Sequence, residues 1–555
     1  MKAFDIGLSA LRAQQLTLSV LGNNLANAST PGYHRQQVDL ATRTPLREDT
    51  FSIGTGVDVT NIRRMKNDAV ETALIRNSSE AGFSQQTKDI AAQIESLLTP
   101  GDSSIHASLS NFFNNLEKVA NAPQDSTARG EFLSSASALM KGFSSLDQGL
   151  TSLGKDVRLT LDDAVKDVNQ TIGDVAQLNS KILLARNLGT EPNDLIDRRD
   201  QLVSQLSDYF EVDSFTLPDG REQIRIAGGA AVIGTDPVTL RVQDFKNGTV
   251  GIAVANSSMS IRLNSGRIAA MTTALNETIP EFKSRLSDLA REIVGTVDQQ
   301  HAQGMTDKGP YSSLLGSRRV TDVTVPLARS NPDFPITNGS LFITVTDAAG
   351  TRRTEEVQID PNTDSLQDVA TKLSSISGVF ANADAASGTL SIAGQGSNSI
   401  DFAGQPDETG ILSALGINSL FEGASPGTFK VRDEILQNPG LLATSATGLP
   451  GDGTNMAALA NLRDLRSNAF SGRTFTEEMA DVTAESGVLV QTADSQDTQL
   501  QAFRQRLEAD RDSVSGVDIN EEMLKMMQSQ RAYQAAARYI TTTDQMLAEL
   551  FQMAR

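Results

Sequence analysis

The sequence contains no cysteine and no tryptophan, and aromatic residues make up only 5% of it. Without cysteine the chain forms neither disulfides nor zinc–thiolate sites, and its compartment stays undecided between the cytosol and a cysteine-free secreted class. No apolar run approaches the ~18 residues that a membrane span needs, so we expect no membrane insertion. The N-terminus also lacks a charged segment followed by a continuous apolar one, so we expect no cleaved signal peptide.

Basic residues are outnumbered: 48 Lys and Arg stand against 68 Asp and Glu, for a formal net charge of −20. Repulsion from phosphate opposes nucleic-acid binding, and we expect no nucleic-acid partner. The acidic excess lies in the middle of the chain. Residues 1–47 carry five basic and two acidic side chains, and residues 521–555 carry four of each. Nearly neutral ends suit segments that pack against other protein surfaces.

Both ends of the chain read as amphipathic helices. In the first, apolar residues recur at the 3.5-residue period of a coiled-coil seam, and Pro31 ends the pattern. Its stripe comprises Phe4, Leu8, Leu11, Leu18 and Leu25. The second stripe comprises Met523, Met526, Tyr533, Ala537, Ile540, Leu547 and Leu550. We expect these helices to pair as a coiled coil or to pack on other molecules.

The middle of the chain combines long helices with small β modules. Heptad spacing over 132–182 predicts one long helix, and the stripe from 479 to 514 predicts its descending partner. Turn signals at Asp219-Gly220 and Asn247-Gly248 predict β hairpins within 211–264. Residues 35–60 are predicted to be an extended, flexible connector, and 310–335 a proline-rich linker. Residues 338–392 are predicted to run in the order β-β-α-β-β.

A chain of 555 residues exceeds the size at which a single core stops growing, so several domains are expected. The predicted fold is multidomain and mainly α, with β insertions and a long antiparallel helical bundle. The predicted domains are 1–60 with 512–555 (terminal coiled-coil assembly domain and connector), 61–210 with 265–309 and 436–511 (long-helix bundle), 211–264 (small β insertion) and 310–435 (β-rich outer domain).

An enzyme is the alternative class, and the sequence offers little for one. His34, His106 and His301 lie far apart and none has a metal-ligand spacing. Residues 423–427 match the Gly-x-Ser-x-Gly nucleophile elbow, but Pro426 has no N–H for the oxyanion hole. The glycines at 228, 229 and 234 fit a turn between short strands better than a phosphate loop. We therefore expect no catalytic residue, no metal and no cofactor.

The first helix ends in a specific pattern. Its residues 23–33 read Asn-Asn-Leu-Ala-Asn-Ala-Ser-Thr-Pro-Gly-Tyr. This run resembles the N-terminal signature of the bacterial flagellar rod, hook and hook-associated proteins. A helix end followed by a Pro-Gly turn explains Pro31 and Gly32, but not the paired asparagines or Tyr33.

Four further segments resemble one branch of that family, the junction proteins between hook and filament. They are 193–202 (Asn-Asp-Leu-Ile-Asp-Arg-Arg-Asp-Gln-Leu), 298–304, 451–462 and 515–538. The second resembles an Asn-x-x-His-x-x-Gly turn, from which Asp298 departs. The β modules match weakly.

The resemblance implies a structural subunit, exported through the flagellar type III apparatus, that joins hook to filament. It implies self-assembly into a helical tube, contacts with hook protein and hook-associated protein 3, and an export chaperone on the C-terminal helix. The predicted assembly interface comprises Phe4, Leu8, Leu11, Leu18, Leu25, Tyr33, Met523, Tyr533, Ile540, Leu547 and Leu550. The alternatives are another axial protein, such as hook protein or hook-associated protein 3, or an unrelated secreted coiled-coil adhesin.

Overall fold

The computed structural model describes residues 2–48, 51–99, 104–226, 230–233, 237–255, 257 and 259–553. The glycines at 228, 229 and 234 lie outside these residues. The chain forms two compact units. The first unit comprises 1–89, 157–276 and 491–555, and the second comprises 90–156 and 277–490. Three long helices contribute to both units: α2 (Asp68–Leu98), α4 (Ser126–Asn187) and α12 (Phe475–Ser515).

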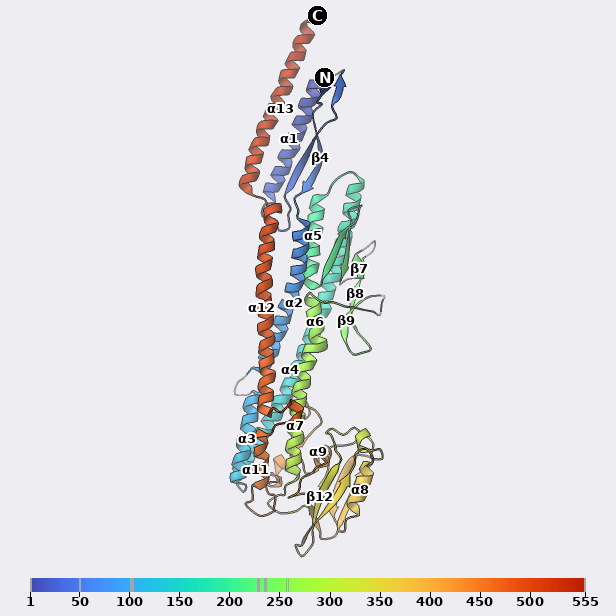
Figure 1. The fold of residues 1–555 in the computed structure, drawn as a ribbon, viewed down its shortest axis with the longest axis vertical. Helices are drawn as coiled ribbons and strands as arrows, with labels where there is room; N and C mark the ends of the chain where they lie inside the picture. Colours follow the sequence, from blue (N-terminus) through green and yellow to red (C-terminus); the bar gives the residue numbers. More distant parts are fainter. Residues whose placement is uncertain are drawn as a thin grey trace. The chain divides into compact units, whose positions relative to one another are not determined.

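In the first unit, helix α1 (Lys2–Ala26) lies beside α13 (Ile519–Met553) (Figure 1). The segment after α1 is an ordered antiparallel ribbon, where the sequence predicted a flexible connector. Its strands β1 (Gln36–Thr42) and β4 (Val57–Arg64) pair directly, and β2 (Leu46–Glu48) pairs with β3 (Phe51–Ile53). Strands β1 and β4 of the ribbon pack on α1. This contact holds the segment that leads from α1 to α2 in place.

The long helices follow the heptad pattern and extend beyond it. The stripe over 132–182 falls within α4, whose full length is 62 residues. Helix α2 begins at Asp68, four residues after strand β4 ends at Arg64. Polar contacts tie α12 to α7 (Ile279–Ala302) in the second unit and to α2 in the first. Phe503, which the heptads of α12 predict to be in the seam, is 49% exposed.

The β insertion of the first unit contains two three-stranded antiparallel sheets, and both predicted hairpins are present. The turns carry Gly220 and Gly248 at φ 84° and 83°, values that favour glycine. One sheet has the order β5-β6-β7 and the other β10-β9-β8. The strands are β5 (Val212–Thr216), β6 (Glu222–Ile226), β7 (Ala230–Ile233), β8 (Leu240–Asp244), β9 (Val250–Val254) and β10 (Ser260–Ile261). Helix α5 (Asn193–Tyr209) precedes this insertion, and α6 (Arg267–Thr273) with a π-helical turn at Ala274–Thr278 follows it.

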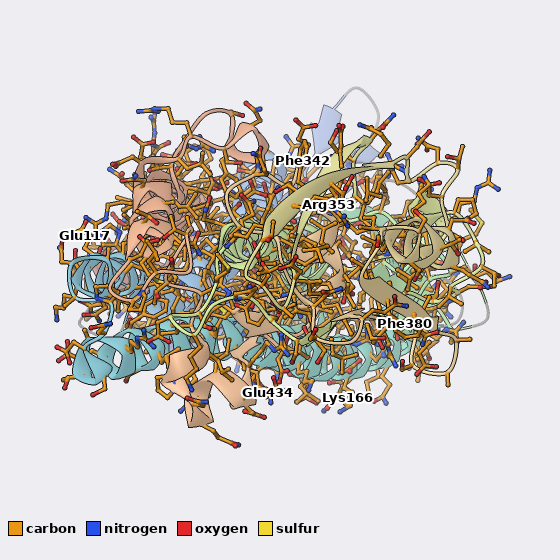
Figure 2. The ribbon with its side chains drawn as sticks, turned by 90° about the horizontal axis from the view of Figure 1, so that it is seen from below. Glu117, Lys166, Phe342, Arg353, Phe380 and Glu434 are labelled. Atoms are coloured by element: carbon orange, nitrogen blue, oxygen red, sulfur yellow. The ribbon has the colours of Figure 1, made fainter. Side chains whose placement is uncertain are left out.

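The second unit holds the outer β module in the predicted order β12-β13-α8-β14-β15. Its elements are β12 (Gly339–Thr346), β13 (Arg352–Ile359), α8 (Leu366–Ser374), β14 (Val379–Asp384), β15 (Thr389–Gly394) and β16 (Ser399–Asp401). Residues 310–335 are not a free linker. They contain β11 (Ser313–Leu315), which pairs with β15, and they bury Val320, Val323 and Leu327 in the module's core. Arg353 and Phe380, labelled in Figure 2, are exposed side chains of these strands.

Short elements complete the second unit. Helix α3 (Ile105–Asn121) carries a core of phenylalanines, with Phe112 and Phe113 fully buried. The remaining elements are η2 (Leu327–Arg329), α9 (Ile411–Leu415), β17 (Phe421–Glu422), β18 (Lys430–Val431), α10 (Asp433–Gln437), η3 (Pro439–Leu441), α11 (Thr454–Asn461), η4 (Leu462–Asp464) and η5 (Asn468–Phe470).

Candidate assembly interface

The two terminal helices approach each other closely. Gly7 of α1 lies against α13, where an added Cβ would sit 2.7 Å from Ile540 Cγ1 and 3.0 Å from the Tyr539 ring. At the other end of the pair, Asn24 contacts Glu522. The helices are therefore antiparallel, and a small residue sets their closest approach.

The predicted apolar stripes are only partly covered by this pairing. Eight of the predicted interface residues are half-buried: Leu8, Leu11, Leu18, Leu25, Tyr33, Tyr533, Ile540 and Leu547. Phe4, Met523 and Leu550 are exposed. The buried apolar residues of α1 are instead Ala13, Val20 and Leu21. The sequence stripe missed them because α1 contacts the β1–β4 ribbon as well as α13, so its buried face is turned away from the heptad seam.

Eight large apolar side chains of α13, on more than one side of the helix, are exposed in the described part of the chain. They are Ile519, Met523, Leu524, Met527, Tyr539, Met546, Leu550 and Met553. Scattered apolar residues on a surface are ordinary, but several along one helix indicate a protein–protein contact. We refer to these eight residues as the outer face of α13.

A buried polar cluster joins the two termini, and Asn24 is at its centre. The Asn24 side chain is 0% exposed and makes four hydrogen bonds. Its Nδ2 donates to Gln36 O and to Glu522 Oε2, each at 2.9 Å. Its Oδ1 accepts from Tyr33 Oη at 2.8 Å and from Gln36 N at 2.9 Å. The amide is fully satisfied, so its position requires both the N-terminal turn and α13.

Burial raises the pKa of Tyr33 well above its usual range, with help from Asp197, Asp194 and Glu522 nearby. Tyr33 therefore keeps its proton and donates a hydrogen bond to Asn24 Oδ1. These interactions explain two residues of the 23–33 signature that a helix end alone does not. We call Asn24, Tyr33, Gln36 and Glu522 the terminal junction.

His34 continues the network into the body of the first unit. Its Nδ1 lies 2.8 Å from Asp197 Oδ1, and its Nε2 lies 3.5 Å from Glu71 Oε1. Arg64 Nη1 donates to Asp197 at 2.7 Å and to Asp200 at 2.8 Å. Burial lowers the pKa of His34, but its bonds to Asp197 and Glu71 outweigh this and raise the pKa to about 9. His34 is therefore a cation at neutral pH and pairs with helix α5 and helix α2.

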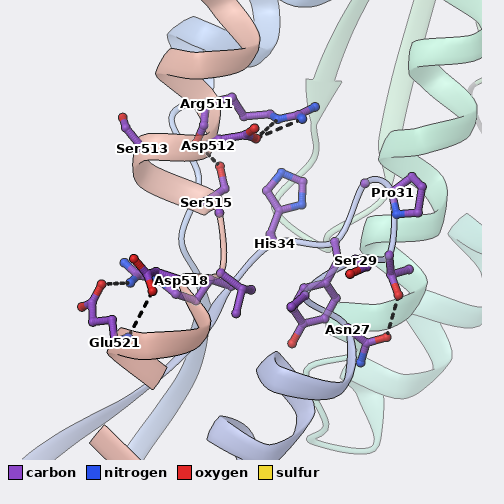
Figure 3. A pocket seen from close by; sticks show the side chains of 17 residues that line it. Asn27, Ser29, Pro31, His34, Arg511, Asp512, Ser513, Ser515, Asp518 and Glu521 are labelled. Atoms are coloured by element: carbon purple, nitrogen blue, oxygen red, sulfur yellow. Dashed lines mark hydrogen bonds and ion pairs between the residues drawn. The ribbon is translucent and has the colours of Figure 1, made fainter. Parts of the chain in front are cut away.

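The backbone completes the junction. Arg35 N donates to Ser515 O at 3.0 Å, which ties the N-terminal turn to the last residue of α12. Asp518 then caps α13, because its Oδ1 accepts from the backbone N–H of Asn520 and Glu521. A polar hollow of about 640 Å³ lies between residues 27–35 and 511–521 (Figure 3). Three of the segments singled out in the sequence, 23–33, 193–202 and 515–538, therefore meet in one place.

Another of the segments singled out in the sequence, 298–304, has a structural role in the second unit. Asp298, fully buried, pairs with Arg318 Nη2 at 2.6 Å and accepts from the backbone N–H of Leu420 and Phe421 at 2.9 Å. His301 is also buried. Its Nδ1 donates to Asn418 O at 2.8 Å, and its Nε2 accepts from Ala443 N at 3.2 Å. The motif therefore binds residues 418–421 and 443, which follow the outer module in the sequence, to helix α7.

The Gly-x-Ser-x-Gly match at 423–427 forms a turn. The Ser425 hydroxyl lies 3.2 Å from that of Thr428 and accompanies backbone bonds closing the same turn. Among the helices of the described residues, none is both long and apolar enough to cross a bilayer.

Comparisons with known proteins match three parts of the chain. Residues 91–314 match the family described as the helical domain of the flagellar hook-associated protein FlgK. Residues 4–34 match the flagella basal body rod protein family, and 511–553 match the C-terminal family of the flagellar basal body rod proteins FlgEFG. The last two matches contain three of the four residues of the terminal junction, Asn24, Tyr33 and Glu522.

Whole-length relatives agree with these matches. The chain is 25% identical to flagellar hook-associated protein 1 of Salmonella typhimurium, over 98% of both chains. It is also 25% identical to flagellar hook-associated protein 1 of Bacillus subtilis, over 97% of this chain and 95% of the relative. The solved structure of the flagellar hook junction protein FlgK from Burkholderia pseudomallei shares the fold, with a TM-score of 0.54 and 16% identity, over 80% of this chain and all of that one.

The fold, the joined termini and the matched segments define an axial structural protein of the bacterial flagellum. Within that class, the chain is similar to flagellar hook-associated protein 1 along almost its whole length. It is a structural protein of the hook–filament junction and not an enzyme.

Proposed function

We propose that the chain polymerises through its terminal segments, 1–60 and 512–555, and so connects the hook to the filament. The observation that carries this proposal is the outer face of α13, the eight exposed apolar side chains of a helix that pairs with α1. Covering these side chains requires another molecule, and a different surface of a second copy is the simplest partner. Heterologous contacts of this kind generate helical tubes.

In this proposal the termini fold as they assemble. Helix α1 and helix α13 bury few side chains completely, and an isolated helix of this length is marginal in water. The terminal helices would be frayed in the free subunit and adopt the arrangement of Figure 1 within the tube. The predicted interface residues, including Phe4, Met523 and Leu550, would then be covered by neighbouring subunits.

The proposed partners are copies of this chain, hook protein and hook-associated protein 3. Before assembly an export chaperone would cover the outer face of α13, since its eight apolar side chains are exposed in the free subunit. The chain would leave the cell through the flagellar type III apparatus and act outside it. The remaining segments would form the long-helix bundle, the β insertion at 211–264 and the outer domain at 310–435.

Limited proteolysis with mass mapping tests the coupled folding. From the purified monomer we expect loss of roughly forty residues at each end, because unprotected termini are cleaved first. The assembled polymer, digested in parallel, is expected to keep both ends. Resistance of both ends in a dilute monomer would show that the termini are already packed, and would contradict folding on assembly.

A further inference from the structure

Helix α12 is held to α2 in the first unit mainly by polar contacts. Ser84 Oγ donates to Ala493 O at 3.0 Å, and Asn77 Nδ2 donates to Leu500 O at 3.2 Å. Lys88 pairs with Asp494 at 2.5 Å. We call these contacts the α2–α12 seam. Side chains that donate to main-chain carbonyls of a neighbouring helix hold position but bury little apolar area.

The α2 side of the seam is polar in its interior. Its buried side chains over this stretch include Asn77, Ser84 and Gln86. The Oδ1 atom of Asn77 is buried and makes no hydrogen bond. A buried acceptor without a partner destabilises the closed state relative to one in which water reaches it.

The α12 side of the seam buries few apolar side chains. Between residues 491 and 514 the buried side chains are Ala493, Asp497 and Leu507, and the six residues 501–506 are all exposed, Phe503 among them. Helix α4 in the same unit offers the contrast. It buries Leu161, Val165, Val168, Ile172 and Val175 along one face. Burial of apolar surface is the main favourable term in packing. Because α4 buries more apolar side chains than this part of α12, separating α4 from its neighbours costs more free energy.

We propose that residues 492–512 of α12 form a strap that opens from α2 while the rest of the first unit stays folded. Opening exposes little apolar surface, and water replaces the hydrogen bonds that Ser84 and Asn77 donate. Both acceptor carbonyls lie within α12, where they also serve the helix. The strap leads through Gly516 into α13, so its opening loosens the hold of the body on the C-terminal helix. This inference does not depend on the proposed polymerisation.

Hydrogen exchange measured by mass spectrometry on the full-length chain tests the strap. We expect amides of 492–512 to exchange about tenfold or more faster than those of 161–175 in α4, since local opening follows the density of buried apolar contacts. Comparable protection of the two segments would overturn the proposal.

A matched pair of variants adds a second test. Asn77→Leu removes the unpaired buried oxygen and adds apolar contact to the seam, so exchange of 492–512 is expected to slow severalfold. Gln505→Leu adds the same side chain on the exposed side of α12 and is expected to leave exchange unchanged. Equal slowing by both variants would show that helix propensity, not the seam, controls the opening, and would also refute the strap.

Discussion

The terminal junction makes Glu522 the most informative residue to change. Glu522 is 1% exposed, and its Oε2 accepts a 2.9 Å bond from Asn24. In Glu522→Ala the Asn24 amide keeps its other three bonds but loses this one, which leaves a buried donor unsatisfied. Such a loss costs about 1–3 kcal/mol. Glu522→Gln keeps an acceptor without the charge, and about half the loss is expected, because charge-assisted bonds are roughly twice as strong.

Polymerisation of the purified subunit, followed by sedimentation, measures this cost. If the junction forms as subunits join, the critical concentration for Glu522→Ala rises by about 5- to 100-fold, at 1.4 kcal/mol per tenfold change. Lys525→Ala serves as the control, because Lys525 also contacts Glu522 but is itself 41% exposed. Assembly of Glu522→Ala at the wild-type concentration would refute the role of the junction in assembly.

Three further predictions concern other parts of the chain. Asp298→Asn leaves Arg318 as a buried charge without its partner and is expected to lower the free energy of unfolding by about 3–5 kcal/mol. The double variant Asp298→Asn with Arg318→Met is expected to recover most of that loss. A urea titration in which the double variant is no more stable than the single one would contradict the pairing. Gly7→Leu is expected to separate the terminal helices, since even a Cβ at residue 7 would lie 2.7 Å from an atom of α13. Gly22→Ala is expected to gain about 0.5–1 kcal/mol of helix stability, because no atom lies within 4 Å of an added Cβ there. Circular dichroism of the assembled protein distinguishes the two variants, and equal effects would count against close packing at Gly7. The His34 pairing raises its pKa from the unfolded value of 6.5 to about 9. Its stabilisation, about 3 kcal/mol, is therefore complete below roughly pH 6.5 and is lost as the pH rises through about 9; urea unfolding across this range tests it, and a His34→Gln variant with the same pH slope would exclude His34 as the source.

Local rules accounted for the elements whose determinants lie close together in the sequence. The apolar heptads of 132–182 predicted α4, since one helix face meets the core along its whole length. Asp219-Gly220 and Asn247-Gly248 predicted two hairpins because their glycines take a positive φ. The order β-β-α-β-β was predicted from alternation and turn residues. The resemblance of both termini to flagellar axial proteins was also visible in the sequence, and the matches at 4–34 and 511–553 confirmed it.

Other assignments needed contacts between distant residues. Residues 310–335 looked like a linker because they lack periodicity, yet β11 pairs with β15 and the segment buries apolar side chains in the module's core. The apolar stripe of α1 was predicted on the assumption that the helix has one partner. The β1–β4 ribbon covers a second face of α1, so the buried apolar residues are Ala13, Val20 and Leu21. Phe503 fits a heptad, yet its side chain is 49% exposed, so heptad spacing alone did not place it against a partner.

The sequence alone determined the helical and β segments of this protein, the acidic middle, the neutral ends and the flagellar family. Each of these depends on composition, on periodicity or on short runs of residues. Only the tertiary structure decided that Asn24, His34, Asp197 and Glu522 form one buried network. Their partners are separated by up to 498 positions, and no local pattern encodes which buried amide meets which carboxylate. The folded chain decides it, because a buried polar group is stable only where its hydrogen bonds are satisfied.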